Sequence, residues 1–101
     1  MAVMAVFTGY GFTKAMYEAL RGVVKWETEP APGGLLHICG FDNVGDLHVT
    51  DVWESEEAMN AFVGTRLVPG FKKVGIPMPQ VVVIPIHNVN LYPEAQRFLL
   101  K

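Results

Sequence analysis

Apolar positions along the chain follow two spacings, and the first of them predicts strands. Residues 47–52 largely alternate between apolar and polar side chains and are rich in β-branched residues, which is typical of a strand. Residues 2–8 and 35–41 are short apolar stretches that end at turn residues. Residues 80–88 are almost continuously apolar, which predicts a fourth strand buried on both faces. Pro85 within this run lacks an N–H donor and indicates a bulge or an edge position.

The second spacing, at three and four residues, predicts two helices. Thr13 can cap a helix that runs to about Val24, and Ser55 can cap a second helix. The apolar stripe of the first helix consists of Met16, Leu20, Val23 and Val24, with Tyr17 beside it. The stripe of the second consists of Met59, Phe62, Val63 and Leu67. Pro69 and Gly70 are expected to interrupt the second helix, with one further helical turn over residues 71–74.

The order of these elements predicts the fold. Strand, helix, strand, strand, helix, strand is the βαββαβ pattern of a ferredoxin-like α+β domain, with a four-stranded antiparallel sheet and two helices on one face. Residues 42–46 carry the chemistry of a hairpin turn, and residues 25–34 form a long loop that can serve as a lid or rim. We expect a single domain over residues 1–101, in which residues 89–101 form a C-terminal arm.

The composition predicts that the chain associates with a second copy of itself. Half of the residues are apolar and only 18% are charged, which is a high apolar content for a chain of 101 residues. A small monomer has little interior in which to hide apolar surface. We therefore expect the uncovered face of the sheet to pack against the same face of a second copy, which gives a homodimer.

Charge and cysteine content argue against several classes of partner. The net charge is -2 and the basic residues are scattered, so nucleic acid is not expected as a partner. The sequence has no run of about 18 apolar residues, so no membrane-spanning helix is expected. Cys39 is the only cysteine, which excludes an internal disulfide and predicts a cytoplasmic location.

The register of the central hairpin decides which polar side chains meet. If Phe41 pairs with Leu47, Asp51 comes opposite His37, and a carboxylate beside an imidazole orients it as a general base. If Phe41 pairs with His48 instead, one face carries His37, Cys39, His48 and Thr50. The sequence leaves both registers open. His37 is the first candidate for proton transfer, with a half-buried strand histidine of no special role as the alternative.

Three histidines also raise the question of a metal site. His37 and His87 fall on the second and fourth predicted strands, which are opposite edges of a ferredoxin-like sheet. One chain would not bring them together as ligands. We therefore expect neither a metal nor another cofactor.

The remaining candidate site residues each have a structural alternative. Trp53 either pins a helix to the sheet or forms a pocket wall with its indole N–H presented to a ligand. Arg66 lies on the apolar stripe of the second helix, where it either forms a salt bridge or offers positive charge to an anionic substrate. Tyr17 either packs in the core or orients a substrate with its phenol. The predicted substrate contacts, besides Trp53, are Phe62, Cys39 and His87, although Cys39 is most simply a small core residue.

The pattern Asp51-x-Trp53-Glu54-Ser55-x-Glu57-Ala58, followed by Phe62, resembles the dimeric α/β-barrel superfamily. It looks most like the antibiotic-biosynthesis-monooxygenase-type branch. Further matches to small bacterial proteins near this branch are Thr13-Lys14-x-x-Tyr17, Gly34-Leu35-Leu36-His37, Gly40-Phe41-Asp42, Arg66-Leu67-x-Pro69, Gly75-Ile76-Pro77 and Pro85-x-His87-Asn88. The resemblance covers nearly the whole chain and implies the same ferredoxin-like protomer in a dimer.

The resemblance implies several activities, because members of the superfamily oxidise aromatic polyketides with O₂ and no cofactor, cyclise polyketides, or degrade haem. Haem-degrading members have a histidine on the second helix as iron ligand and an asparagine on the first strand. Here residues 55–74 contain no histidine and residues 2–10 contain no asparagine, so haem degradation is not expected. Two classes of function remain. One is a cofactor-independent oxygenase or cyclase that binds an apolar or aromatic ligand, and the other is a non-catalytic ligand-binding or structural homodimer of the same fold.

Overall fold

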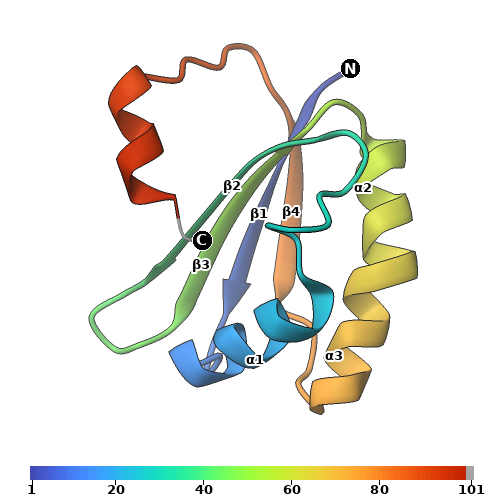
Figure 1. Ribbon diagram of the computed structural model, residues 1–101, viewed down its shortest axis with the longest axis vertical. Coiled ribbons are helices and arrows are strands. Elements are labelled where there is room, and N and C mark those ends of the chain that lie inside the picture. The colour runs from blue at the N-terminus through green and yellow to red at the C-terminus, as the bar shows by residue number, and fades with distance from the viewer. Residues whose placement is uncertain (100–101) are drawn as a thin grey trace.

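Four strands form one antiparallel sheet in the computed structural model, which describes residues 1–99. The strands are β1 (Val3–Gly9), β2 (Gly34–Phe41), β3 (Leu47–Trp53) and β4 (Gln80–Pro85). Their order across the sheet is β2-β3-β1-β4, so β1 and β3 are central and β2 and β4 are edges (Figure 1). This order and the intervening helices confirm the predicted ferredoxin-like α+β fold.

The first helix, α1 (Lys14–Val24), begins and ends where the sequence indicates. The Thr13 hydroxyl accepts a hydrogen bond from the Met16 N–H at 3.2 Å and so caps the first turn. At the other end Lys25 adopts a left-handed conformation and donates its N–H to the Arg21 carbonyl. Tyr17, Leu20 and Val24 are the buried residues of α1.

The second helical segment runs on through Pro69, which corrects the expected interruption. It consists of α2 (Glu56–Phe62), a π-helical turn (Val63–Leu67) and α3 (Val68–Val74) without a break. In the π turn the Val68 N–H donates to the Val63 carbonyl, five residues back. Pro69 stands at the start of α3, next to this widened turn, where a residue without an N–H donor does not end the helix.

The core lies between the helices and one face of the sheet, which we call the covered face. Alternate residues of β1 and β3 point to it and are buried, among them Ala5, Phe7 and Val49. The helices contribute Leu20, Met59, Phe62, Leu67 and Phe71 to the same cluster. Trp53, at the end of β3, packs against Phe62 with ring centroids 5.3 Å apart.

On the opposite face of the sheet, which we call the open face, no α-helix packs among the described residues. Its strand positions include Met4, Val6, Ile38, Thr50, Val82 and Ile84. Val82 is 59% exposed and Ile84 41% exposed, so the prediction that the fourth strand is buried on both faces is wrong for the single chain. The edge position expected from Pro85 is confirmed, because β4 pairs with β1 alone among the described strands.

The chain leaves the sheet three residues earlier than predicted, because β4 ends at Pro85. The C-terminal arm then carries a 3₁₀ helix (Pro93–Phe98), with its proline in the first turn as expected. Every described residue of the arm, 89–99, is exposed. Figure 1 shows the arm to the left of β2 in the view, whereas α2 and α3 lie to the right of the strands. Residues 100 and 101 of the predicted arm lie outside the described residues.

Candidate functional site

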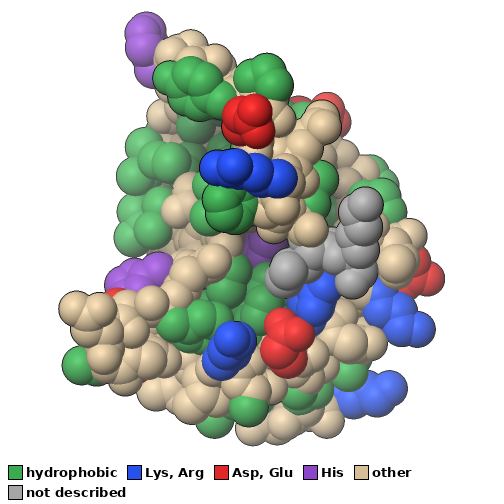
Figure 2. Space-filling view, turned by 60° about the vertical axis from the view of Figure 1, so that its left-hand side comes forward, with side chains coloured by type: hydrophobic (Ala, Val, Ile, Leu, Met, Phe, Trp, Pro, Cys, Tyr) green, Lys and Arg blue, Asp and Glu red, His purple; other side chains and the backbone are tan. Residues whose placement is uncertain are grey.

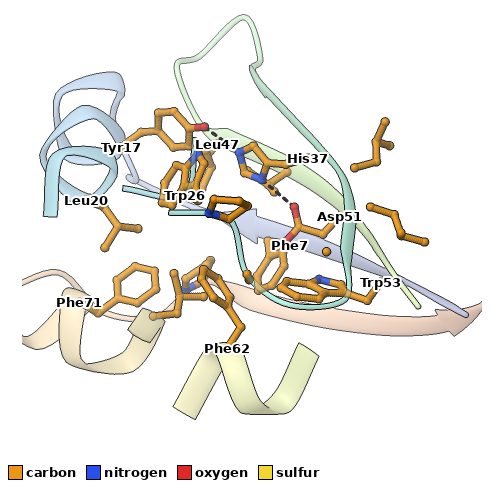
Figure 3. Close-up of a pocket in the computed structure, with 18 of the residues that line it drawn as sticks. Phe7, Tyr17, Leu20, Trp26, His37, Leu47, Asp51, Trp53, Phe62 and Phe71 are labelled. Carbon is orange, nitrogen blue, oxygen red and sulfur yellow. Dashed lines mark hydrogen bonds and ion pairs between the residues drawn. The ribbon is translucent and has the colours of Figure 1, made fainter. Parts of the chain in front are cut away.

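A cavity of about 260 Å³ lies between the covered face and the helices. Its volume is slightly below the range of roughly 300–1,000 Å³ that small-molecule sites occupy. Most of its lining is apolar, and the residues used below are Tyr17, Trp26, His37, Asp51, Trp53 and Phe62. Figure 3 shows three polar side chains on one side of this space and the rings of Phe62, Phe71 and Trp53 on the other.

The hairpin register brings His37 opposite Asp51. Phe41 pairs with Leu47, which is the first of the two registers that the sequence allowed. The turn fixes this register, because the Asp42 carboxylate accepts hydrogen bonds from the Val44 and Asp46 N–H groups, each at 3.0 Å. His48 consequently points away from the cavity and pairs with Asp42 at 2.8 Å on the surface.

Three polar side chains form a hydrogen-bonded series along the cavity wall. His37 Nδ1 lies 2.7 Å from Asp51 Oδ1, and His37 Nε2 lies 2.7 Å from the Tyr17 hydroxyl (Figure 3). Asp51 is a buried charged residue at 8% exposure, and its carboxylate accepts the Nδ1 proton. Nε2 is thereby left as the basic nitrogen, which accepts the Tyr17 hydroxyl proton.

Tyr17 is held in its neutral form. Burial of the phenol raises its pKa above the ordinary value, because the charged phenolate would lose its hydration. The ring lies parallel to the His37 imidazole, with an interplanar angle of 8°. Tyr17 therefore serves His37 as a hydrogen-bond donor at neutral pH.

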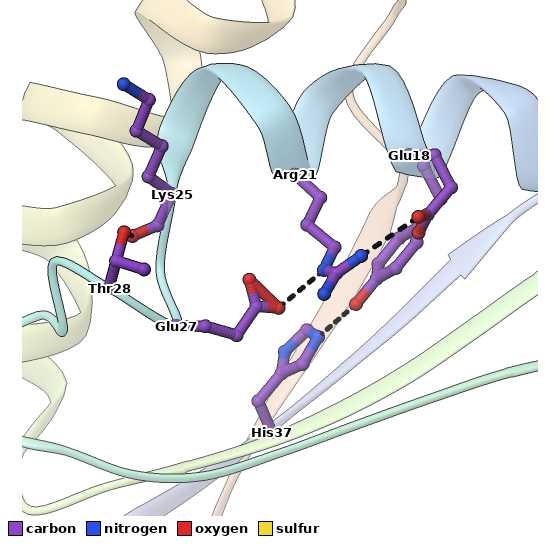
Figure 4. Close-up of polar contacts among 7 residues, drawn as sticks. Glu18, Arg21, Lys25, Glu27, Thr28 and His37 are labelled. Carbon is purple, nitrogen blue, oxygen red and sulfur yellow. Dashed lines mark hydrogen bonds and ion pairs between the residues drawn. The ribbon is translucent and has the colours of Figure 1, made fainter. Parts of the chain in front are cut away.

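Trp26 is a cavity residue that the sequence reasoning missed. It lies in the loop after α1, and its ring contacts Tyr17 and His37 at centroid distances of 5.5 and 5.2 Å. The preceding helix holds this loop, because Arg21 donates to Glu27 at 2.6 Å and to Glu18 at 2.9 Å (Figure 4). The prolines and glycines of the loop predict a lid or rim, but no periodic pattern singles out one aromatic within it.

Two indole groups add unused hydrogen-bond donors to the lining. The Nε1 atoms of Trp26 and Trp53 are buried, and neither has a hydrogen-bond acceptor among residues 1–99. Buried donors of this kind are uncommon, because leaving one unsatisfied costs about 1–3 kcal/mol. Both side chains line the cavity.

Of the other predicted site residues, the structure brings only Phe62 to the cavity. Arg66 does not line it, because its guanidinium donates to the Val24 carbonyl at 2.8 Å and lies over the Phe62 ring. It therefore ties the second helical segment to the end of α1. Cys39 faces the same side of the sheet as His37 but is half-buried against the core. His87 is exposed and lies beyond the end of β4.

The structure also bears on metal sites and membrane spans. Among the described residues, no group of three His, Cys, Asp or Glu side chains is arranged to hold a metal ion. Over the same part of the chain, no helix is both long enough and apolar enough to cross a membrane.

Comparison with known proteins identifies the fold. No protein-family model and no curated protein matches the sequence. Among solved structures, a monooxygenase from the gene ActVA-Orf6 of Streptomyces coelicolor, in complex with nanaomycin D, is 20% identical with a TM-score of 0.63, and the match covers 90% of each chain. SnoaB, a cofactor-independent oxygenase from Streptomyces nogalater, is 10% identical with a TM-score of 0.64, over 87% of this chain and 94% of that chain.

A third similar structure is a Chloroflexus aurantiacus protein that carries the name antibiotic biosynthesis monooxygenase. It is 15% identical with a TM-score of 0.63, over 89% of this chain and 98% of that chain. At these identities the similarity is one of fold. The chain has the ferredoxin-like α+β fold of antibiotic-biosynthesis-monooxygenase-type proteins.

Proposed function

We propose that the cavity binds a small apolar ring compound and that His37 removes a proton from it. The observation that carries this proposal is the Tyr17–His37–Asp51 series, which lies in the wall of an apolar cavity. A base needs a fixed tautomer and a substrate held within hydrogen-bond reach. Asp51 provides the first, and the aromatic lining supports the second.

Tyr17 gives the proton a path to the base. A substrate hydroxyl that contacts the Tyr17 oxygen can release its proton to the phenol as the phenol passes its own proton to His37 Nε2. The raised pKa of Tyr17 supports this path, because the phenol returns to its neutral form after each transfer. The Trp26 and Trp53 indoles supply donors for ring oxygens of the ligand.

The anion produced in this way has two chemical outcomes. A phenolate or enolate is electron-rich, so it can react with O₂ directly or attack a carbonyl group to close a ring. The first outcome is that of a cofactor-independent oxygenase, which is the activity named for the structural neighbour SnoaB. The second is that of a cyclase.

A ligand panel with matched variants tests the proposal. Hydroxylated naphthoquinones and their hydrocarbon parents would be screened by thermal shift, with O₂ uptake followed for the compounds that bind. Replacing His37 with Ala should lower kcat by about 10²–10⁴-fold while KM changes little. Trp53→Phe should weaken binding instead.

His48→Ala is the matched control, because His48 also pairs with an aspartate but lies outside the cavity. It should leave turnover unchanged. Equal activity of the His37 and His48 variants would overturn the assignment of the base.

Non-catalytic ligand binding is the second candidate function. It is favoured by the fact that both ring nitrogens of His37 already have protein partners. In that case the compounds bind and Trp53→Phe weakens their binding, but no compound is turned over.

We also infer that the chain forms a homodimer through its open faces. The strand positions of this face include no Asp, Glu, Lys or Arg, so two copies can meet without burying like charges. Exposed Ile38, Val82 and Ile84 supply apolar area for such contact. The single cysteine supports a reducing location such as the cytoplasm.

A further inference from the structure

We propose that Trp26 selects the ligand of the cavity through its indole N–H, which donates a hydrogen bond to a carbonyl oxygen of the ligand. This inference rests on the ligand binding of the proposed function and narrows the class of ligand. The ligand so defined is an uncharged ring compound with carbonyl oxygens at two separated positions, one for each indole of the cavity wall. The inference does not depend on proton transfer to His37.

Trp26 brings an unused donor to the wall of the cavity. Its side chain is only half-buried, but its Nε1 atom is buried and has no acceptor among residues 1–99. An indole nitrogen donates a hydrogen bond and does not accept one. A ligand that covers this N–H without pairing it leaves a buried donor unsatisfied, which is costly. A ligand with an acceptor at this point is therefore favoured over one without.

Trp53 provides a second donor at a different part of the wall. It is 4% exposed, its Nε1 atom is likewise buried and unpaired within the described chain, and its ring packs on Phe62. Trp26 instead contacts Tyr17 and His37 (Figure 3). Because the two indoles pack against different residues, together they favour a ligand that carries acceptors at two positions.

The charge of the lining favours uncharged acceptors. Asp51 is the only Asp, Glu, Lys or Arg among the described residues that line the cavity, and it pairs with His37. An anionic ligand would find no Lys or Arg there and would lie near the Asp51 carboxylate, which is unfavourable in a buried site. Charged side chains lie on the outer surface, where Figure 2 shows them around a hydrophobic hollow. Carbonyl oxygens are therefore the acceptors that suit the cavity best.

Trp26 is held in place through both ends of its loop. At one end Arg21 pairs with Glu27 at 2.6 Å, and at the other the Glu54 N–H donates to the Gly33 carbonyl at 2.9 Å. A donor that is fixed before binding loses little further freedom when the ligand arrives. The indole is therefore preorganised to receive an acceptor.

The test uses two ligands that differ in their acceptors. Duroquinone and durene share the same methyl-substituted ring, and duroquinone adds a carbonyl oxygen at each end of it. The substituted ring resists addition of the Cys39 thiol. Neither compound has a hydroxyl proton for His37 to remove, so the result is independent of the proposed chemistry. Isothermal titration calorimetry gives both dissociation constants for the unmodified chain and for Trp26→Phe, and comparing their ratios cancels the difference in ligand hydration.

We expect Trp26→Phe to weaken duroquinone binding about tenfold and durene binding less than about twofold, because phenylalanine keeps an aromatic ring and removes the donor. Tyr10→Phe is the matched control, since it removes a polar atom from an aromatic residue that is 78% exposed and does not line the cavity. It should change neither constant.

Three results would overturn the inference. Equal weakening of both ligands by Trp26→Phe would show that Trp26 packs against the ligand without selecting it. Binding of durene without binding of duroquinone would exclude the two-carbonyl class. Failure of both compounds to bind the unmodified chain would do the same, while binding of hydroxylated compounds in the ligand panel would leave the proposed function standing.

NMR of the unmodified chain gives a second readout, which does not depend on the stability of a variant. The chain has two tryptophans, so the nitrogen-labelled protein gives two indole N–H signals, and either single tryptophan variant assigns them. A hydrogen bond moves an indole proton signal to lower field. Duroquinone should move both signals to lower field, and by more than durene does. A Trp26 signal that moves equally with both compounds would contradict the hydrogen bond.

Discussion

At the scale of single residues, the site depends on one pairing across a hairpin. A shift by one position would turn His37 or Asp51 to the other face of the sheet, because strand side chains alternate. The Asp42 side chain prevents this shift through its hydrogen bonds inside the turn. A residue with no contact to the cavity thus decides which groups line it.

The chemistry of Cys39 provides a test at this scale. Burial raises the pKa of its thiol, so the reactive thiolate forms only at a higher pH than in a free cysteine. We expect iodoacetamide to alkylate Cys39 more slowly than it alkylates glutathione at pH 8, with the rate rising further as the pH increases. Mass spectrometry over a pH series measures this. Alkylation as fast as that of glutathione would contradict the burial of the thiol.

The sequence predicted the site residues only in part, for reasons that individual side chains show. Tyr17, His37, Trp53 and Phe62 lie at the cavity because strand parity and helical spacing determine where they point. Arg66 has the same helical spacing, but a long side chain can reach a distant acceptor, here the Val24 carbonyl. The spacing of residues along a helix determines the direction of each Cα–Cβ bond, but it does not determine where the guanidinium at the end of a long side chain lies.

At the scale of elements, the close approach of α1 and α3 depends on Gly70. A Cβ at this position would lie 2.7 Å from Val24 Cγ2, and the β-branched Val24 has little rotamer freedom in a helix. We expect Gly70→Ala to destabilise the fold by about 1–3 kcal/mol through overpacking.

Gly22 provides the control for that substitution. It lies within α1, and a Cβ added there would meet no neighbouring group within 4 Å, so Gly22→Ala should stabilise the fold by about 0.5–1 kcal/mol. Urea unfolding of both variants measures the difference. A Gly70→Ala protein as stable as Gly22→Ala would show that the two helices are not in close contact.

The loop that carries Trp26 has its own test. The Arg21–Glu27 ion pair is partly exposed, so Glu27→Gln should raise the population of open loops only a few-fold, because exposed ion pairs contribute little to stability. In a Trp53→Phe background, Trp26 is the only tryptophan, and acrylamide quenching of its fluorescence should increase.

Glu29→Gln is the matched control for the loop. Glu29 lies in the same loop, and no ion pair is formed by it among the described residues. Quenching that increases equally in both variants would show that the ion pair does not hold the loop.

Element boundaries were predicted best where a local signal exists. The caps Thr13 and Ser55 mark helix starts through their own hydrogen bonds, and these follow from the sequence. The continuation of the helix through Pro69 does not follow from the sequence. It depends on the π turn before Pro69, and a π turn forms according to how the helix packs on the core. The same holds for β4, because an apolar run does not show whether both faces of a strand are covered, and Val82 and Ile84 are exposed in the described chain.

At the scale of the whole molecule, a substitution on the open face is expected to change the proposed dimer formation without changing the stability of the protomer. Val82 is already exposed in the single chain, so Val82→Glu should change protomer stability by no more than about 0.5 kcal/mol. If the proposed open-face dimer forms, the substitution should nevertheless shift the chain toward monomer, because a two-fold axis would bring two buried carboxylates into one interface. Light scattering after gel filtration measures the mass.

Val44→Glu is the control for the open face. Val44 is 82% exposed at the tip of the hairpin turn, and the same substitution there should leave the mass unchanged. If Val82→Glu is still a dimer with the parent mass, the open face is not the interface.

The π turn also determines how the chain aligns with relatives. Phe71 follows Met59 by 12 positions, and both are buried on the same core. In a regular α-helix, residues 12 positions apart differ by about 120° in direction, whereas residues 11 apart differ by only about 20°. A relative with an unbroken α-helix here should therefore carry a one-residue gap between these positions. Deleting Gly64 from this chain would reproduce that shorter spacing.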